Sequence, residues 1–440
     1  MIDLKDKKLV AQGRNNLELA EKNMGALMKL RARFKREQTF RGLKIGMALH
    51  ITKETGVLVR TLQDGGADIA ITSCNPLSAQ NDVVAALQAE GIAAYGYKGE
   101  TRQEYYTFLK RVLAFEPQIT IDDGCDLISE LHENHSQLLK KIIGGCEETT
   151  TGVLRLHAMA RDKALKYPVI AVNDNETKHL MDNYYGTGQS TLDGIIRATN
   201  VLFAGKIVVV AGYGDCGKGV AMRAKGLGAN VIVTEVRQFR ALQAVMDGFL
   251  VMPMAEAAKL GDLFVTVTGD IDVIRPEHFQ AMKNGAILAN SGHFDVEIDI
   301  KGLARLAIDK CVVRPNLVEY VLKGQTPNSR LKKDSADKKQ SAGDFLRAQK
   351  SLYLVGEGRL ANLAAAEGHP SEVMSMSFCG QALAVEYLLK NKGKLKPGVY
   401  QLPKALDEKI AALQLEVLGI SIDRLSAKQL KYLGGWKEGT

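Results

Sequence analysis

The chain has 440 residues, 46% of them apolar and 25% charged, a composition that excludes disordered and fibrous proteins. At roughly 150 residues per domain, this length predicts two or three domains. The formal net charge of +8 would suit a nucleic-acid partner, but half of it lies in Arg330–Lys350, which holds seven basic and three acidic residues. The rest of the chain is nearly balanced, so we expect no nucleic acid among the partners.

Cysteine spacing and the N-terminal sequence bear on the cellular compartment. Six cysteines are scattered, without a CxxC or a Cys–His pair at the spacing of zinc ligands: Cys74, Cys125, Cys146, Cys216, Cys311 and Cys379. Scattered thiols in a long chain are typical of the reducing cytoplasm. The charged N-terminus lacks the apolar core of a signal peptide, and no run approaches the ~18 apolar residues of a membrane span. We therefore expect a cytoplasmic protein without a metal site and without a membrane partner.

Short apolar strands alternate with amphipathic helices in two blocks of the chain. The first block predicts strands over 43–49, 68–72, 92–95, 119–121 and 169–172, with helices over 57–62 and 82–87. The second predicts strands over 207–210, 231–234, 249–252, 264–267 and 286–288, with helices over 218–227, 241–246, 255–260 and 277–282. Alternation of this kind predicts parallel sheets that are covered by helices on both faces.

Glycines interrupt the pattern within 185–191 and mark the boundary between the blocks. The predicted fold is α/β, with two doubly wound, Rossmann-like parallel-sheet domains and a small C-terminal helical segment. We expect the first domain to cover 1–185 and to be completed by about 364–396. The second domain would cover 186–363, with a charged surface insertion near 324–349. A C-terminal segment over 397–440, with an amphipathic stretch over 406–418, would contact another subunit.

The second block opens with a dinucleotide-binding pattern. The strand at 207–210 is followed by Gly212-Tyr213-Gly214-Asp215-Cys216-Gly217, then by a helix and a second strand that ends at Glu235. The glycines allow a tight turn and a close approach to pyrophosphate, and the helix N-terminus offers free N–H groups. Glu235 would accept the ribose hydroxyls and repel a 2′-phosphate, which favours NAD over NADP, although the nearby Arg237 and Arg240 weaken that preference.

Polar residues follow four strands of the first block, where parallel sheets bind their ligands: His50, Ser73-Cys74-Asn75, Asp122-Asp123 and Asn173-Asp174. Helix capping is the alternative for each one taken singly. Together they predict a pocket. Lys178 stands nearby with acidic neighbours in sequence, which would raise its pKa, whereas burial would lower it, so the sign of the shift stays open.

Seven segments carry a resemblance to one family: 50–55 (HITKET), 73–78 (SCNPLS), 147–152 (EETTTG), 173–174 with 177–178 (ND, TK), 212–215 (GYGD), 290–297 (NSGHFDVE) and 357–363 (EGRLANL). In this order they resemble S-adenosyl-L-homocysteine hydrolases from about Leu19 to Leu433, apart from the charged insertion. The resemblance implies tightly bound NAD and a homotetramer. It also implies reversible hydrolysis to adenosine and L-homocysteine by transient oxidation of the 3′-hydroxyl, loss of the C4′ proton, elimination, and addition of water.

The resemblance also implies roles for individual residues. Lys178 would take the 3′-hydroxyl proton, Glu148 would bond that hydroxyl, and Asp182 would orient Lys178. Asp123 and His50 would handle the C4′ proton and the water, with assistance from His293. The substrate-binding set would add Thr52, Glu54, Thr55 and His369 around the adenine. The cofactor set would comprise Thr149, Thr150, Thr151, Asn183, Asn290, Ser291, Gly292, His293 and Asn362, together with Gly212, Gly214, Asp215, Cys216, Gly217, Lys218, Gly219, Glu235 and Arg240.

The sequence departs from the family pattern at several positions. Cys125 replaces a glycine, Ala79 and Asn81 remove a hydroxyl and a charge, and the usual Glu-x-Asp-Pro reads Glu235-Val236-Arg237-Gln238. The Lys/Tyr tail of many members is absent before Thr440, so we expect looser retention of NAD. Three alternatives stay open: a dehydrogenase that releases NADH, a non-catalytic nucleotide sensor, and hydrolysis of S-inosyl-L-homocysteine, against which the acceptor Glu54 favours adenine.

Overall fold

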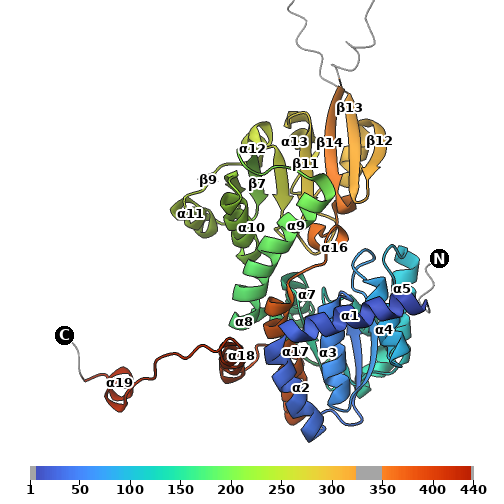
Figure 1. Ribbon diagram of the computed structural model, residues 1–440, viewed down its shortest axis with the longest axis vertical. Coiled ribbons are helices and arrows are strands. Elements are labelled where there is room, and N and C mark those ends of the chain that lie inside the picture. Colours follow the sequence, from blue (N-terminus) through green and yellow to red (C-terminus); the bar gives the residue numbers. More distant parts are fainter. Residues whose placement is uncertain (1–5, 324–348, 438–440) are drawn as a thin grey trace, which may run out of the picture.

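The computed structural model describes residues 6–323 and 349–437, and it confirms the predicted α/β class with two Rossmann-like sheets. Figure 1 shows two lobes, each built around one sheet and covered by helices. Apart from Gln349, the predicted charged insertion lies outside the described residues. Within 6–323 and 349–437, no helix is both long and apolar enough to cross a membrane.

The first sheet is parallel throughout and has the order β15-β6-β5-β4-β1-β2-β3. Its strands are β1 (Lys44–Ala48), β2 (Asp68–Thr72), β3 (Ala93–Ala94), β4 (Ile119–Asp122), β5 (Gly144–Glu147), β6 (Pro168–Ala171) and β15 (Gly398–Tyr400). Ala48 pairs with Asp122, and Asp122 pairs with Glu147. This register brings the residues that follow β1, β4 and β5 to the same edge of the sheet.

The second sheet has the order β12-β13-β14-β11-β10-β7-β8-β9. Its strands are β7 (Ile207–Ala211), β8 (Asn230–Thr234), β9 (Leu250–Val251), β10 (Leu263–Thr266), β11 (Ala286–Asn290), β12 (Ala307–Arg314), β13 (Leu317–Lys323) and β14 (Gln349–Val355). The six neighbouring strands β14, β11, β10, β7, β8 and β9 run parallel, whereas β13 is antiparallel to both β12 and β14. The fully buried valines of β7 lie at the centre of this lobe.

Helices cover both sheets and join the lobes. Those up to the second sheet are α1 (Lys7–Asn23), α2 (Gly25–Glu37), α3 (Lys53–Asp64), α4 (Asn81–Ala89), α5 (Arg102–Ala114), α6 (Asp126–Asn134), α7 (Thr150–Arg161), α8 (Glu176–Lys178) and α9 (Thr187–Thr199), with the short turns η1 (Ser136–Lys141), η2 (Val172–Asp174) and η3 (His179–Gly186). Later helices are α10 (Asp215–Gly226), α11 (Gln238–Met246), α12 (Met254–Leu260), α13 (Pro276–Ala281), α14 (Ile300–Leu306), η4 (Gly356–Gly358), α16 (Ala361–Ala364), α17 (Ser371–Lys390), α18 (Lys404–Val417) and α19 (Ala427–Leu433).

The chain returns to the first lobe after the second sheet is complete. The long helix α17 packs against α2 and α3, and β15 then pairs with β6. The sequence had grouped β15 with the C-terminal segment over 397–440, whereas the structure places it at the edge of the first sheet. The domain limits themselves stay a prediction.

Beyond α18 the chain leaves the body of the molecule. Residues 416–437 are exposed, and Figure 1 shows α19 standing apart from both lobes. This C-terminal arm, residues 418–437, presents large apolar side chains to solvent: Leu418, Ile420, Ile422, Leu425, Leu430, Tyr432, Leu433 and Trp436.

Candidate active site

A cavity of about 1280 Å³ is lined by residues of both lobes. The first lobe contributes residues that follow β1, β4 and β5, and the second contributes the turn after β7 and the loop after β11. Parallel sheets place their ligands beyond the carboxyl ends of the strands, so the position of the cavity follows from the two sheets. Most of the residues predicted for the site line this cavity: His50, Thr52, Thr55, Asp123, Glu148, Thr149, Thr150, Thr151, Lys178, Asp182, Asn183, Gly212, Gly214, Asp215, Cys216, Glu235, Arg240, Ser291, Gly292, His293, Asn362 and His369.

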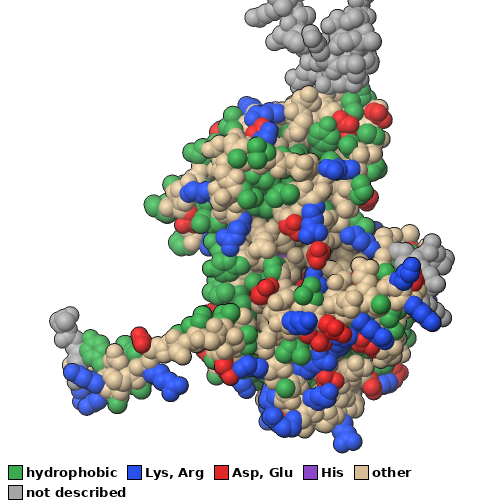
Figure 2. All heavy atoms as spheres, viewed as in Figure 1, with side chains coloured by type: hydrophobic (Ala, Val, Ile, Leu, Met, Phe, Trp, Pro, Cys, Tyr) green, Lys and Arg blue, Asp and Glu red, His purple; other side chains and the backbone are tan. Residues whose placement is uncertain are grey.

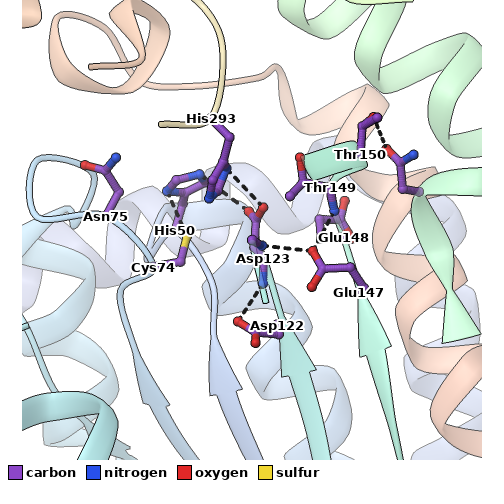
Figure 3. Close-up of polar contacts among 12 residues, drawn as sticks. His50, Cys74, Asn75, Asp122, Asp123, Glu147, Glu148, Thr149, Thr150 and His293 are labelled. Carbon is purple, nitrogen blue, oxygen red and sulfur yellow. Dashed lines mark hydrogen bonds and ion pairs between the residues drawn. The ribbon is translucent and has the colours of Figure 1, made fainter. Parts of the chain in front are cut away.

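Asp123 faces two neighbouring imidazoles, those of His50 and His293, beyond the carboxyl end of β4 (Figure 3). Its carboxyl oxygens are 3.4 Å from His50 Nε2 and 3.5 Å from His293 Nδ1. Burial lowers the pKa of His50 to about 4, although Asp123 opposes the shift. His50 is therefore a neutral imidazole at pH 7, able to receive a proton. The arrangement joins three groups that can exchange one proton.

The other nitrogen of His50 faces two residues that the sequence had not assigned to the reaction. Nδ1 is 2.7 Å from Ser78 Oγ and 3.2 Å from Cys74 Sγ. Both follow β2, and they fix the ring plane of His50. Within the described residues, His50, Cys74 and Asp123 also form a group that could hold a metal ion, because one ligand atom of each lies within 4.8 Å of the others.

The backbone after β4 explains how His293 reaches Asp123. Gly124 has φ +103°, and a Cβ at this position would overlap the imidazole of His293. Cys125 has φ +65°, a left-handed conformation that favours glycine, and glycine is the family residue there. Its side chain is buried.

Lys178 is the centre of a second buried cluster. Its Nζ donates to Asn183 Oδ1 at 2.7 Å and lies 3.3 Å from Asp182 and 3.7 Å from Glu148. Burial alone would lower the pKa of Lys178, but Asp182 and Glu148 outweigh it and raise this pKa above its ordinary value. The structure thus settles the sign that the sequence left open, and Lys178 is an ammonium in the free protein.

A π-helical turn, η3, shapes this cluster. An α-helix places residues i and i+4 on one face, and the wider π turn brings i+5 to the same side. Asp182 and Asn183 therefore both reach Lys178. The sequence had given no signal for this turn, because its period differs from that of a regular helix.

The two carboxyls beside Lys178 differ in their surroundings. Burial raises the pKa of Glu148 to about 7, although the nearby positive charge of Lys178 acts to lower it. Burial would also raise the pKa of Asp182, but Lys178 and His369 outweigh it, so that this pKa lies well below its usual range. His369 Nδ1 pairs with Asp182 Oδ1. Near neutral pH, Glu148 is therefore the member of this cluster that can gain or lose a proton.

Helix α17 supplies partners that the sequence analysis missed. Ser377 Oγ and Gln381 Nε2 donate to the two oxygens of Glu148. Another residue of α17, Ser371, donates from Oγ to Glu54 Oε1 at 2.6 Å. The available signal is a row of polar residues in an otherwise apolar, buried helix, but nothing local relates them to Glu148.

Glu54 does not line the cavity directly, although it lies between Thr52 and Thr55, which do. It is 1% exposed, and its Oε2 has no hydrogen-bond partner among the residues that the structure describes. A buried acceptor without a donor is unfavourable unless a ligand supplies the donor. Thr52 caps the N-terminus of α3 and thereby fixes this end of the cavity.

The turn after β7 fits a dinucleotide. Gly212 has φ +105°, and a Cβ there would lie 2.8 Å from the carbonyl oxygen of Val267. Gly214 faces Arg240, whose Nη1 would lie 3.2 Å from a Cβ at that position. Glu235 Oε2 accepts from the backbone N–H of Tyr213 at 2.8 Å, which fixes the acid beside the turn. This turn has room for pyrophosphate because Gly212 and Gly214 carry no side chain.

Some predicted cofactor residues lie outside the cavity lining. Gly217 packs against the carbonyl of Gly212 and Gly219 against that of Tyr184, in both cases where a Cβ would overlap backbone. These two glycines thus let α10 approach its neighbours. Lys218 is also not part of the lining.

Asn290 was predicted as a cofactor residue, and its side chain is hydrogen-bonded to β10, to η4 and to the loop that follows β11. Its Oδ1 accepts from Thr266 Oγ1 and the Gly292 N–H, and its Nδ2 donates to the carbonyls of Gly292, Phe294 and Gly358. Asn290 therefore holds the loop that carries His293. The neighbouring Ser291 and Gly292 face the cavity.

Comparison with known proteins identifies the family. Two family models match: S-adenosyl-L-homocysteine hydrolase over residues 2–137, and its NAD binding domain over 183–329. An S-inosyl-L-homocysteine hydrolase of Methanocaldococcus jannaschii is 54% identical over 100% of both chains. Adenosylhomocysteinases of Sulfurisphaera tokodaii and Aquifex aeolicus are each 53% identical, over 99% and 100% of this chain and 99% of their own. With matches at this level along its whole length, the chain belongs to the S-adenosyl-L-homocysteine hydrolase family and carries that family's NAD-binding domain.

Proposed function

We propose that this protein reversibly hydrolyses S-adenosyl-L-homocysteine to adenosine and L-homocysteine, with NAD as a cofactor that is regenerated in each turnover. The observation that carries the proposal is the presence of two separate proton-handling clusters, around Lys178 and around Asp123, in the same cavity as the dinucleotide turn. A plain dehydrogenase needs one acid–base group at the carbon that it oxidises. The second cluster suits a further proton transfer at a neighbouring carbon.

The residues of the turn after β7 would hold NAD, with Glu235 at the adenosine ribose and Thr149, Thr150 and Thr151, at the start of α7, towards the nicotinamide. When bound, NAD supplies a reversible acceptor for the 3′ hydride, and a ketone at C3′ makes the adjacent C4′ hydrogen acidic. The protein's own groups then determine where protons are held and moved.

Lys178 and Glu148 would act at the 3′-oxygen. As an ammonium, Lys178 donates to that oxygen and stabilises negative charge on it. Lys178 holds its own proton more tightly than Glu148 does, so the Glu148 carboxylate, 3.7 Å from Lys178 Nζ and with a pKa of about 7, would take the hydroxyl proton while Lys178 stabilises the oxygen. We therefore assign the pair, rather than Lys178 alone, to this proton.

Asp123, His50 and His293 would act at C4′ and C5′. The neutral imidazole of His50 is available as a base, and Asp123 lies within 3.5 Å of both rings. A proton taken from C4′ can thus pass to the departing thiolate, which leaves a base in this cluster free to take a proton from the attacking water.

S-inosyl-L-homocysteine is the second candidate substrate, because relatives of similar identity carry either name. The unpartnered Oε2 of Glu54 favours adenine, since the exocyclic amino group is a donor whereas the oxygen at position 6 of hypoxanthine is an acceptor. A comparison of kcat/KM for the two thioethers decides the question. Faster cleavage of the inosyl compound would overturn the choice of adenine.

The mechanism is tested by adding adenosine to the purified holoenzyme and following NADH absorbance on the protein. We expect bound NADH to form, and the C4′ hydrogen of adenosine to exchange with deuterium from D₂O. An enzyme with intact NAD that gives neither signal would contradict the proposal. Release of free NADH in excess of enzyme would instead indicate a simple dehydrogenase.

We also propose a cytoplasmic homotetramer in which the C-terminal arm packs on another subunit. In support, Figures 1 and 2 show the arm projecting from the body with apolar side chains on its surface. Exposed apolar residues on and around α11 offer a matching surface: Val236, Phe239, Leu242, Val245, Met246 and Leu250. Light scattering of the full chain and of a chain ending at Val417 tests this, and an unchanged mass would refute the role of the arm.

A further inference from the structure

Lys53 links the adenine end of the cavity to the segment that joins the lobes. Its Nζ lies 3.3 Å from Glu54 Oε1 and 3.0 Å from Glu367 Oε2. Glu367 follows α16, and its other oxygen is 3.3 Å from Arg197 of α9. The Lys53 side chain is only 14% exposed, whereas that of Glu367 is 57% exposed. The more shielded of the two ion pairs of Lys53 is therefore the one with Glu54.

The two oxygens of Glu54 have different environments. Oε1 receives the hydroxyl of Ser371 and faces the ammonium of Lys53. Oε2 is buried and has no hydrogen-bond partner among the described residues. Because both stabilising groups act on Oε1, Oε2 remains a free acceptor, and the neighbours of Glu54 in sequence, Thr52 and Thr55, line the cavity.

We infer that Lys53 is a specificity-determining positioning residue, which together with Ser371 holds Oε1 of Glu54, leaves Oε2 free as an acceptor, and so makes the cavity select a 6-aminopurine over a 6-oxopurine. The inference rests on the proposed function. A 6-amino group can donate a hydrogen bond to the free oxygen of Glu54. A 6-oxo group is itself an acceptor and cannot form this bond.

The charge of Lys53 is secure in this environment. Burial would lower the pKa of Lys53, but Glu54 and Glu367 outweigh it and raise this pKa. Full-length identity does not separate the two substrate classes, since relatives named for inosyl and for adenosyl substrates are 54% and 53% identical to this chain. The local charge around Glu54 is thus the feature on which selectivity would depend.

The test is the ratio of kcat/KM for S-adenosyl- and S-inosyl-L-homocysteine, measured on NAD-loaded enzyme. We expect Lys53→Met to lower this ratio at least tenfold, by slowing adenosyl cleavage and speeding inosyl cleavage. Lys53→Gln serves as a second uncharged variant in case the methionine variant folds poorly, and the same direction is expected. Lys53→Arg keeps the charge and should keep the ratio within about threefold.

Glu367→Gln is the matched control within the same cluster. It removes the other partner of Lys53 but leaves the ammonium facing Glu54, so the ratio should stay the same or rise. If Lys53→Met lowers kcat/KM equally for both substrates and leaves their ratio unchanged, Lys53 has only a structural role and the inference is overturned. A wild-type preference for the inosyl thioether would overturn it as well. If the wild-type protein cleaves neither compound, the proposed function itself fails.

Discussion

The carboxyl group of Glu147 occupies the space that a side chain at position 152 would need, because a Cβ on Gly152 would overlap it. Glu147 is fully buried, and its Oε1 accepts from the backbone N–H of Gly124 at 2.9 Å and of Thr149 at 3.0 Å. It thereby ties the loop that follows Asp123 to the loop that carries Glu148. The two proton-handling clusters are held in register by this one side chain.

Glu147 should act as a neutral group. Burial, reinforced by Asp122 and Asp123, raises its pKa well above the ordinary value. Glu147→Gln keeps the acceptor oxygen and should retain kcat within about threefold, whereas Glu147→Ala unties both loops and should lower kcat at least tenfold. Steady-state kinetics with matched circular dichroism checks this. Equal losses in the two variants would mean that a charged carboxylate is required.

Gly152 should tolerate no larger residue. In Gly152→Ala the methyl group displaces Glu147, and overpacking of this kind typically costs about 1–3 kcal/mol. We expect a lower free energy of unfolding together with a loss of activity. Urea unfolding of Gly152→Ala beside Glu147→Gln measures the first effect. A variant as stable and active as wild type would show that Glu147 can move without consequence.

Gly124→Ala should impair the reaction through His293. The added methyl group would overlap the His293 ring, so His293 must leave Asp123, and we expect kcat to fall by about two orders of magnitude. Gly99→Ala is the control, because Gly99 has a similar φ of +94° but open space around its Cβ position. Both variants carry the backbone strain, about 1 kcal/mol or more. Equal activity in the two would contradict a role for the His293 contact.

Much of the fold follows from local sequence. The strands β2, β7 and β8 are rich in β-branched residues and β1 is a short, mostly apolar run, and the predicted ranges agree with all four to within two residues. The strand β5 was missed because it reads Gly144-Gly145-Cys146-Glu147. Its glycines are needed for packing, since a Cβ on Gly144 would lie 2.7 Å from Leu388 and one on Gly145 would lie 2.6 Å from Thr120. Those partners are remote in sequence, so no local pattern reveals the strand.

The site was predictable as a set of residues but not as a geometry. Strand ends and motifs pointed to His50, Asp123 and Lys178, and the parallel register explains why they meet. The support of Glu148 by Ser377 and Gln381 joins residues more than 200 positions apart, and the sign of the Lys178 pKa depends on how deeply this side chain is buried beside Asp182 and Glu148. Sequence spacing carries no information on either.

His50 should make the protein less stable in acid. Its pKa of about 4 in the folded protein lies below the value near 6.5 of an unfolded chain, so the unfolded state takes up the proton first as the pH falls. Stability is therefore lost between pH 6.5 and 4, by up to about 3 kcal/mol. Urea unfolding at pH 7 and 4.5 should show a smaller loss in His50→Gln than in wild type, with the exposed His157→Gln as control. An identical loss in all three proteins would refute this assignment.

Glu148 should show the opposite dependence. Its folded pKa of about 7 lies above the ordinary value of 4.5, so the folded state holds the proton more strongly and stability falls as the pH rises from 4.5 through 7. Glu148→Gln mimics the protonated form, because its oxygen can accept from one donor of α17 while its amide group donates, like the acid proton, to the hydroxyl oxygen of Ser377 or to the amide oxygen of Gln381. At pH 8 it should be more stable than wild type by a few kcal/mol at most, while kcat falls by at least a hundredfold because the proton partner of Lys178 is lost. Unfolding and kinetics at pH 6 and 8 test both effects on the same samples. A variant that is less stable than wild type at pH 8 would show that the attraction between the ionised carboxylate and Lys178 stabilises the protein by more than burial of that carboxylate destabilises it.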